Sequence, residues 1–215
     1  MPLRYNSMPH KLRQYYLTQM GIDVWLQRAA PDLKKGLEPL ARAVSACVRC
    51  PLHASRTKTV FSRGNPDASL MIVGAAPGFE EDQQGVPFVG GSGRLLNKML
   101  SSIGLTNDNV YITNVLKCRP PANSTPSENM ISQCCDYLSQ QIKIVAPKLI
   151  LGVGHIAGQF LLNTRLSIHD MRSKVHDVDG IPTIISFDPA HLLQNPHDKK
   201  QAYSDLLFVK QCLGH

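Results

Sequence analysis

Four cysteines are spaced so that they could share one metal centre. Cys47 and Cys50 form a Cys-x-x-Cys pair, Cys118 follows an apolar segment, and Cys134 lies further along the chain. Two close thiolates and two distant ones can close a four-coordinate cage around zinc or around an iron–sulfur cluster. The spacing alone does not separate these two kinds of centre. The sequence therefore predicts a four-thiolate site of one kind or the other.

A second position with chemical potential is Asp188. It follows the apolar run PTIISF and stands directly before Pro189. The carboxyl ends of strands are where open α/β sheets place their ligand sites. We therefore expect Asp188 to lie at a binding site, where the sign of its charge matters.

The elements that would position these residues alternate along the chain. Four short segments rich in β-branched residues are typical of buried parallel strands. They span residues 70–74, 110–115, 148–154 and 182–187, and helical stretches are expected at 91–103, 127–145, 155–163 and 199–213. This order predicts a three-layer α/β/α sandwich with a mainly parallel four-stranded sheet and right-handed crossovers.

The amino-terminal residues follow another pattern. Residues 9–20 carry an apolar stripe at helical spacing, and Gly21 suits the end of such a helix. An extended stretch with Trp25 and a linker follow. We therefore expect a helical arm and linker over residues 1–35 and a globular domain over residues 36–215.

Charge is unevenly distributed along the 215 residues. Residues 1–56 carry nine Lys and Arg against three Asp and Glu, whereas residues 57–215 carry fourteen against thirteen. A basic arm can contact nucleic acid or an acidic protein surface, while a nearly neutral body predicts only weak contact with DNA. The chain has no run of 18 apolar residues and no apolar leader, so we expect a cytoplasmic protein without membrane contact.

Three long stretches resemble the iron–sulfur (family 4) uracil-DNA glycosylases. They are residues 47–100 (CVRC to NKML), 110–142 (VYITNVLKC to SQQI) and 146–162 (APKLILGVG to QFLL). The resemblance implies the glycosylase fold for the domain. It also implies that a 4Fe-4S cluster, rather than zinc, is held by Cys47, Cys50, Cys118 and Cys134.

The same resemblance implies a pocket for a base flipped out of the DNA stack. Phe88 matches the aromatic residue that stacks on the base, and Asn114 matches the amide that reads the edge of uracil. Glu81 and Asp82 match the acidic pair of the family. Without the resemblance, these residues are more typical of a packed core, a satisfied strand end and a solvated turn.

Two motifs depart from the family pattern. Ala75 in GAAPG stands where the family has Glu, and Asp188 in DPA stands where it has a His that stabilises the departing uracil. Losing one such donor typically costs about 2.7–4 kcal/mol. An ionised carboxylate about 4 Å from the developing anion adds repulsion on the order of 4 kcal/mol at an effective dielectric of about 20. We therefore expect lost catalysis, unless Asp188 is kept protonated by a strongly raised pKa.

Residues 13–28 resemble the amino-terminal segment of the psi subunit of bacterial DNA polymerase III, which docks on the clamp-loader collar. The resemblance implies a partner-binding segment within residues 9–28. Its contact residues would be Arg13, Leu17, Met20, Gly21, Ile22, Trp25 and Arg28. The competing expectation is that this helix packs on its own domain.

Together these patterns predict a non-catalytic, psi-like clamp-loader accessory subunit, with a chi-type subunit as second partner. The alternative is an active uracil-DNA glycosylase with Glu81, Asp82 and Asp188 as its catalytic candidates. Its base pocket would contain Ala75, Phe88, Asn114 and Asp188.

Overall fold

The computed structural model describes residues 36–214. They belong to one compact unit, Lys34–His215. The arm predicted for residues 1–35, with every position assigned to partner binding, lies outside the described residues. Within residues 36–214, no helix is both long enough and apolar enough to cross a lipid bilayer.

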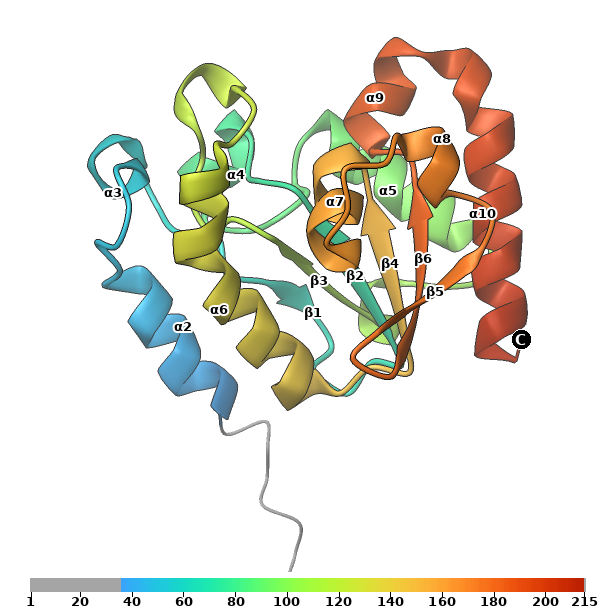
Figure 1. Cartoon of the computed structure of the whole chain (residues 1–215), viewed down its shortest axis with the longest axis horizontal. Coiled ribbons are helices and arrows are strands. Elements are labelled where there is room, and N and C mark those ends of the chain that lie inside the picture. Colours follow the sequence, from blue (N-terminus) through green and yellow to red (C-terminus); the bar gives the residue numbers. More distant parts are fainter. Residues whose placement is uncertain (1–35, 215) are drawn as a thin grey trace, which may run out of the picture. The chain divides into compact units, whose positions relative to one another are not determined.

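A mixed sheet of six strands forms the middle layer of the described unit, in the order β1-β3-β2-β4-β6-β5 (Figure 1). The strands are β1 Arg63–Gly64, β2 Leu70–Gly74, β3 Val110–Asn114, β4 Leu149–Val153, β5 Val175–Val178 and β6 Ile181–Ser186. The inner four, β3, β2, β4 and β6, are parallel and correspond to the four predicted strands. The predicted fold class is therefore confirmed.

The two edge strands were not predicted, because neither has a buried apolar run. β1 has only two residues, and β5 alternates between exposed and half-buried positions. Both pair antiparallel with their neighbours. Short or polar edge strands of this kind limit pairing with other chains.

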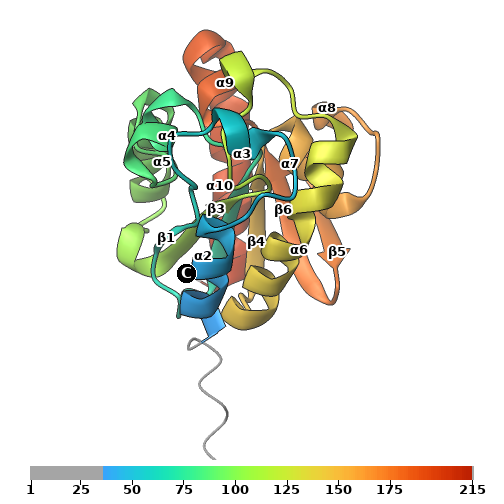
Figure 2. The same cartoon turned by 90° about the vertical axis from the view of Figure 1, so that its left-hand side faces the viewer.

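Helices cover both faces of the sheet, and Figure 2 shows α5 and α6 on opposite sides of it. The longer helices are α2 Leu37–Ser45, α5 Gly91–Ser101, α6 Glu128–Val145, α7 His155–Leu162 and α10 Lys199–Leu213. The shorter ones are α3 Leu52–Ser55, α4 Phe79–Gln84, α8 Ile168–Met171 and α9 Pro189–Gln194. Single 3₁₀ turns lie at Asn107–Asn109, Pro121–Asn123 and Pro196–Asp198.

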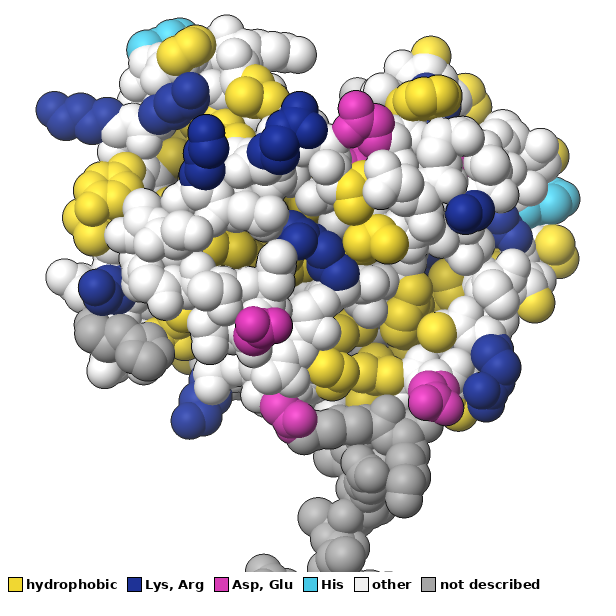
Figure 3. Space-filling view, turned by 180° about the vertical axis from the view of Figure 1, so that it is seen from behind, with side chains coloured by type: hydrophobic (Ala, Val, Ile, Leu, Met, Phe, Trp, Pro, Cys, Tyr) yellow, Lys and Arg dark blue, Asp and Glu magenta, His cyan; other side chains and the backbone are white. Residues whose placement is uncertain are grey.

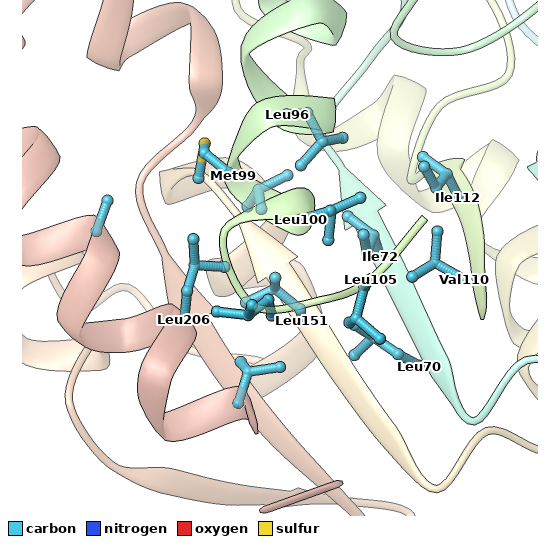
Figure 4. Packing of buried hydrophobic residues seen from close by; sticks show 14 of the residues in the cluster. Leu70, Ile72, Leu96, Met99, Leu100, Leu105, Val110, Ile112, Leu151 and Leu206 are labelled. Atoms are coloured by element: carbon cyan, nitrogen blue, oxygen red, sulfur yellow. The ribbon is translucent and has the colours of Figure 1, made fainter. Parts of the chain in front are cut away.

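Alternate residues of each inner strand enter two different cores, as the two-residue period of a strand requires. In β2, Leu70 and Ile72 pack toward α5 and α10, as Figure 4 shows. Met71 and Val73 pack instead against α6 and α7. These strands are buried on both faces, and this explains their continuous apolar sequence.

The parallel inner strands end at one edge of the sheet, and their arrowheads point the same way in Figure 1. The register pairs Gly74, the last residue of β2, with Asn114, the last residue of β3. Gly154 follows β4, and Asp188 follows β6 by two residues. Residues far apart in the sequence therefore meet at the carboxyl edge.

A buried ion pair fixes the end of β6 against α10. Two guanidinium nitrogens of Arg172 donate to the carboxylate of Asp205, with distances of 2.8 and 3.0 Å. The Ser186 hydroxyl donates to the same carboxylate at 2.7 Å. The guanidinium also lies over the Phe187 ring, 4.1 Å from its centroid. This network holds the backbone that leads into Asp188.

We predict that Arg172→Met lowers the free energy of unfolding by about 3–5 kcal/mol, because Asp205 then stays buried without its counter-charge. Urea unfolding followed by circular dichroism measures the change. Arg165→Met is the matched control, since the Arg165–Glu128 pair is 88% exposed on both sides and contributes little. Equal midpoints for the two variants would contradict the stabilising role of the buried pair.

Candidate active site and cysteine centre

A cleft of about 360 Å³ opens at the carboxyl edge of the sheet. Its walls come from the segments that follow β2, β3, β4 and β6. The lining residues are Ala75, Ala76, Pro77, Gly78, Glu81, Phe88, Ser92, Asn114, Pro120, Asn123, Ser124, Thr125, Pro126, Gly154, His155, Ile156, Asp188 and Ala190. The structure thus brings together five of the residues predicted for the site, from three separate stretches of sequence.

Asn114 presents an amide oxygen with no partner. The side chain is 2% exposed, and its Oδ1 atom accepts no hydrogen bond from any residue that the structure describes. A buried polar atom without a partner costs about 1–3 kcal/mol. Native proteins rarely keep such an atom unless a ligand or water satisfies it.

Lys117, which was not predicted from the sequence, holds the backbone of Asn114 in place. Its ammonium group is fully buried and donates to the Asn114 carbonyl, to the Thr113 hydroxyl at 2.8 Å and to Gln141 Oε1 at 2.6 Å. Burial lowers the pKa of Lys117 to about 7, although nearby Cys134 acts in the opposite direction. A Lys that directly continues a buried strand was the available signal in the sequence.

Phe88 forms one wall of the cleft in an uncommon backbone conformation. Its φ angle is +54°, in the left-handed region that non-glycine residues rarely adopt. A side chain at Gly93 would collide with the Phe88 carbonyl, and one at Gly74 would collide with the Phe88 ring and with Asn114 Oδ1. The two glycines therefore make room for the ring and the amide to lie side by side.

Glu81 holds the backbone around Phe88. Its Oε1 atom accepts hydrogen bonds from Val89 N at 3.0 Å and Gly90 N at 3.3 Å, while Oε2 accepts from Gly78 N at 3.1 Å. The carboxylate lines the cleft, yet three backbone donors occupy it. Its observed contacts thus orient the cleft wall.

Asp82 does not line the cleft, although the sequence grouped it with Glu81 as a catalytic candidate. It is 1% exposed and accepts hydrogen bonds from the backbone nitrogens of Thr57 and Lys58. Consecutive helical residues point in different directions, so the two acids separate. Asp82 anchors the segment that follows the Cys-x-x-Cys pair.

Asp188 lies at the cleft wall and caps α9. Its Oδ1 atom accepts a hydrogen bond from Ala190 N at 2.7 Å. Burial raises the pKa of Asp188 above its ordinary value, and Glu81 acts in the same direction; the Ala190 N–H and His191 oppose the shift. Ala75 lines the same cleft and contributes no ionisable group.

The four predicted cysteines line a second, smaller cavity. Cys47 and Cys50 come from the loop between α2 and α3, Cys118 follows β3, and Cys134 lies in α6. All four thiols are free. The cavity therefore lies between three segments that are distant in the sequence, and the four cysteines line it.

Two nitrogen donors approach these sulfurs. Arg56 Nη1 donates to Cys118 Sγ at 3.2 Å, and Lys117 N donates to Cys134 Sγ at 3.4 Å. Burial raises the pKa of the Cys134 thiol to about 11, and it also raises that of Cys118. Across residues 36–214, no three Cys, His, Asp or Glu side chains form a recognisable site for a single metal ion. The donor set itself, four sulfurs with N–H groups directed at them, suits a thiolate-bound cluster.

Comparison with known proteins identifies the family. Residues 61–208 match the model of the uracil DNA glycosylase superfamily. A type-4 uracil-DNA glycosylase of Archaeoglobus fulgidus is 37% identical over 188 residues, which cover 84% of this chain and 94% of that protein. The type-4 enzyme of Thermotoga maritima is 40% identical over 161 residues, covering 74% and 84% of the two chains. That of Sulfurisphaera tokodaii is 37% identical, covering 81% and 84%.

These relatives overturn the prediction of a non-catalytic psi-like subunit. The similarity to named glycosylases extends over most of the chain, whereas the likeness to psi rested on sixteen residues outside the described part. The residues at positions 75 and 188 differ from the family pattern, but most of the chain matches the family. The chain belongs to the uracil-DNA glycosylase superfamily and, within it, to the family of the type-4 enzymes.

Proposed function

We propose that this protein is a DNA glycosylase that hydrolyses the bond between uracil and deoxyribose. The observation that carries the proposal is the unpartnered, buried Oδ1 atom of Asn114 in the cleft wall. A ligand that offers an N–H group there would satisfy it. The similarity to type-4 uracil-DNA glycosylases supports uracil as that ligand.

The amide of Asn114 suits the edge of uracil. Uracil carries an N–H donor at N3 beside an oxygen at C4, so one amide can accept from the first and donate to the second. Cytosine has an acceptor at N3 and an amino group at C4, which leaves both amide groups mismatched. Sites built around such a hydrogen bond reject the wrong base strongly, because a buried group then stays unpaired.

Phe88 would bind the face of the same base. Its ring is next to Asn114 above Gly74, so a base stacked on the ring has its edge toward the amide. Glu81 holds the adjoining backbone through three hydrogen bonds. Preorganised contacts of this kind reduce the entropy lost on binding.

Asp188 would act in its protonated form. As the glycosidic bond breaks, its electron pair moves onto uracil, and a donor near the base oxygen stabilises that charge. A neutral carboxyl group can supply this donor, whereas an ionised one repels the charge. Burial and Glu81 both favour the neutral form. Water adds to the sugar carbon, and uracil leaves with a proton.

We further propose that Cys47, Cys50, Cys118 and Cys134 hold a 4Fe-4S cluster. The cluster would join the loop before α3, the segment after β3 and α6, and so add metal–sulfur bonds to the fold. Cys118 lies four residues after Asn114. The cluster would therefore fix the position of the cleft wall without contacting the base.

We predict that the protein releases uracil from a single-stranded oligonucleotide with one deoxyuridine and that Asn114→Ala slows the release by about 10²- to 10³-fold. Single-turnover kinetics measure the rate. Asn129→Ala, which changes an exposed amide in α6, should leave the rate unaltered. Absence of uracil release by the unsubstituted protein would refute the proposed function.

Excision should slow as the pH rises through the raised pKa of Asp188, because the carboxyl group then loses its proton and repels the departing base. We expect Asp188→Asn to remove this fall and to exceed the unsubstituted protein in rate by about ten-fold or more at high pH. Rates measured at several pH values test this prediction. His191 and Glu81 also face the carboxyl group, so His191→Gln serves as a control that should retain the fall. Parallel pH profiles for the protein and Asp188→Asn would contradict the role of Asp188.

Protein purified without oxygen should be brown and contain about four iron atoms per chain. Cys134→Ser should lose most of the iron and the visible absorbance, because it removes one ligand from the buried side of the cavity. The neighbouring Cys135→Ser is the matched control and should retain both. A colourless protein loaded with zinc would show that the four thiols hold the other kind of centre.

A further inference from the structure

Phe79 and the half-buried Arg119 form a pair that the proposed chemistry does not use. Phe79 begins α4 and is 56% exposed, and the guanidinium carbon of Arg119 lies 5.0 Å from the centre of its ring. Within the described part of the chain, two large aromatic side chains are exposed, namely Phe79 and Tyr203 of α10. A cation over one face of an aromatic ring orients that ring.

The pair connects the two walls of the cleft. Phe79 directly follows Gly78, a lining residue of one wall, and Arg119 directly precedes Pro120 of the other. Arg119 Nε donates to Oδ1 of Asn123, another lining residue, at 2.7 Å. Neither side chain lines the cleft, but both are attached to the segments that form it, and Arg119 is bonded to one of its lining residues.

Arg119 has N–H groups that remain available to bind a ligand. Its Nε atom is bonded to Asn123, while no acceptor among residues 36–214 bonds its two terminal amino groups. A guanidinium fork with unoccupied N–H groups suits the oxygens of a phosphate. An aromatic ring beside such a fork is the combination that binds unpaired nucleotides, by stacking on the base and by charge on the backbone.

The surface around the cleft is compatible with a nucleic acid strand. On the face seen in Figure 3, several Lys and Arg side chains lie in the upper part, beside a notch between two raised lobes. The strand ends point toward the same end of the molecule. A polyanion crossing this end would pass over the cleft.

We propose that Phe79 and Arg119 bind the nucleotide next to the excised base in single-stranded DNA. The Phe79 ring stacks on the neighbouring base, and the terminal amino groups of Arg119 bind the phosphate between the two nucleotides. This proposal rests on the proposed glycosylase function for the occupant of the cleft. An unpaired strand is favoured because its neighbouring base is free to leave its own stack.

The test is binding of a fluorescent single-stranded oligonucleotide that carries 2′-fluoro-2′-deoxyuridine, which keeps its glycosidic bond intact. Fluorescence anisotropy gives the dissociation constant. Two further probes lack the base on the 5′ or the 3′ side of the uridine. We expect Phe79→Ala to weaken binding of the complete probe by at least about five-fold. Phe79→Ala should not weaken binding of the probe that lacks the base on which Phe79 stacks, whether that is the 5′ or the 3′ neighbour.

Control variants separate stacking from damage to the fold. Phe79→Trp should retain the affinity, since the larger ring also stacks. Tyr203→Ala, the matched loss of an exposed aromatic side chain, should not change it. Arg119→Gln should reduce the slope of log affinity against log salt by about 0.7, the value for one phosphate contact on a single strand.

The outcomes distinguish this site from the proposed function. An effect of Phe79→Ala that is equal on all three probes, or absent, overturns the stacking site, as does failure of the protein to bind the complete probe. Equal weakening on a duplex probe overturns the preference for an unpaired strand. Uracil release from unmodified DNA is measured in parallel. If the protein releases uracil but Phe79→Ala does not weaken binding, the glycosylase function stands and the stacking site is refuted. If Phe79→Ala weakens binding but no uracil is released, the binding site stands and the glycosylase function is refuted.

Discussion

The cleft depends on one costly feature, a buried amide oxygen that the described protein leaves without a donor. The expected cost is about 1–3 kcal/mol, and the surroundings of Asn114 prevent its relief. The pairing of β2 with β3 fixes Asn114 opposite Gly74, and the absence of a side chain at Gly74 admits the Phe88 ring. A carbonyl bonded to the Lys117 ammonium anchors the backbone. The protein thus holds an incomplete hydrogen bond that a ligand with a matching N–H group can complete.

Lys117 links the cleft to the cysteine cavity. Its ammonium group bonds the backbone and side chains at the end of β3, and its own N–H group donates to Cys134 Sγ. Because the ammonium is fully buried, its three hydrogen bonds must all be kept to offset the lost hydration. A shift of α6 would therefore be transmitted to Asn114. The cysteine cavity and the cleft are therefore connected through Lys117.

The sequence was sufficient for the inner sheet, because β2, β3 and β4 are buried over their whole length and β6 over its last four residues, and these segments are rich in apolar residues. It could not reveal β1 or β5, whose pairing depends on neighbouring strands. It grouped Glu81 with Asp82, but a helix turns adjacent side chains apart. It also missed Lys117, because the Gln141 oxygen that helps to satisfy the buried ammonium lies 24 residues away in α6. The prediction of a non-catalytic protein rested on the residues at positions 75 and 188, and the relatives that match most of the chain contradict it.

The cleft is assembled from loops that follow four parallel strands, and the residues at positions 75 and 188 belong to different loops. Changes at well-separated positions usually add in their effect on stability. Evolution can therefore exchange the residue at one loop tip, as at Ala75 or Asp188, without rebuilding the strand ladder. Single residues of the cleft wall can therefore change while the sheet that carries them stays the same.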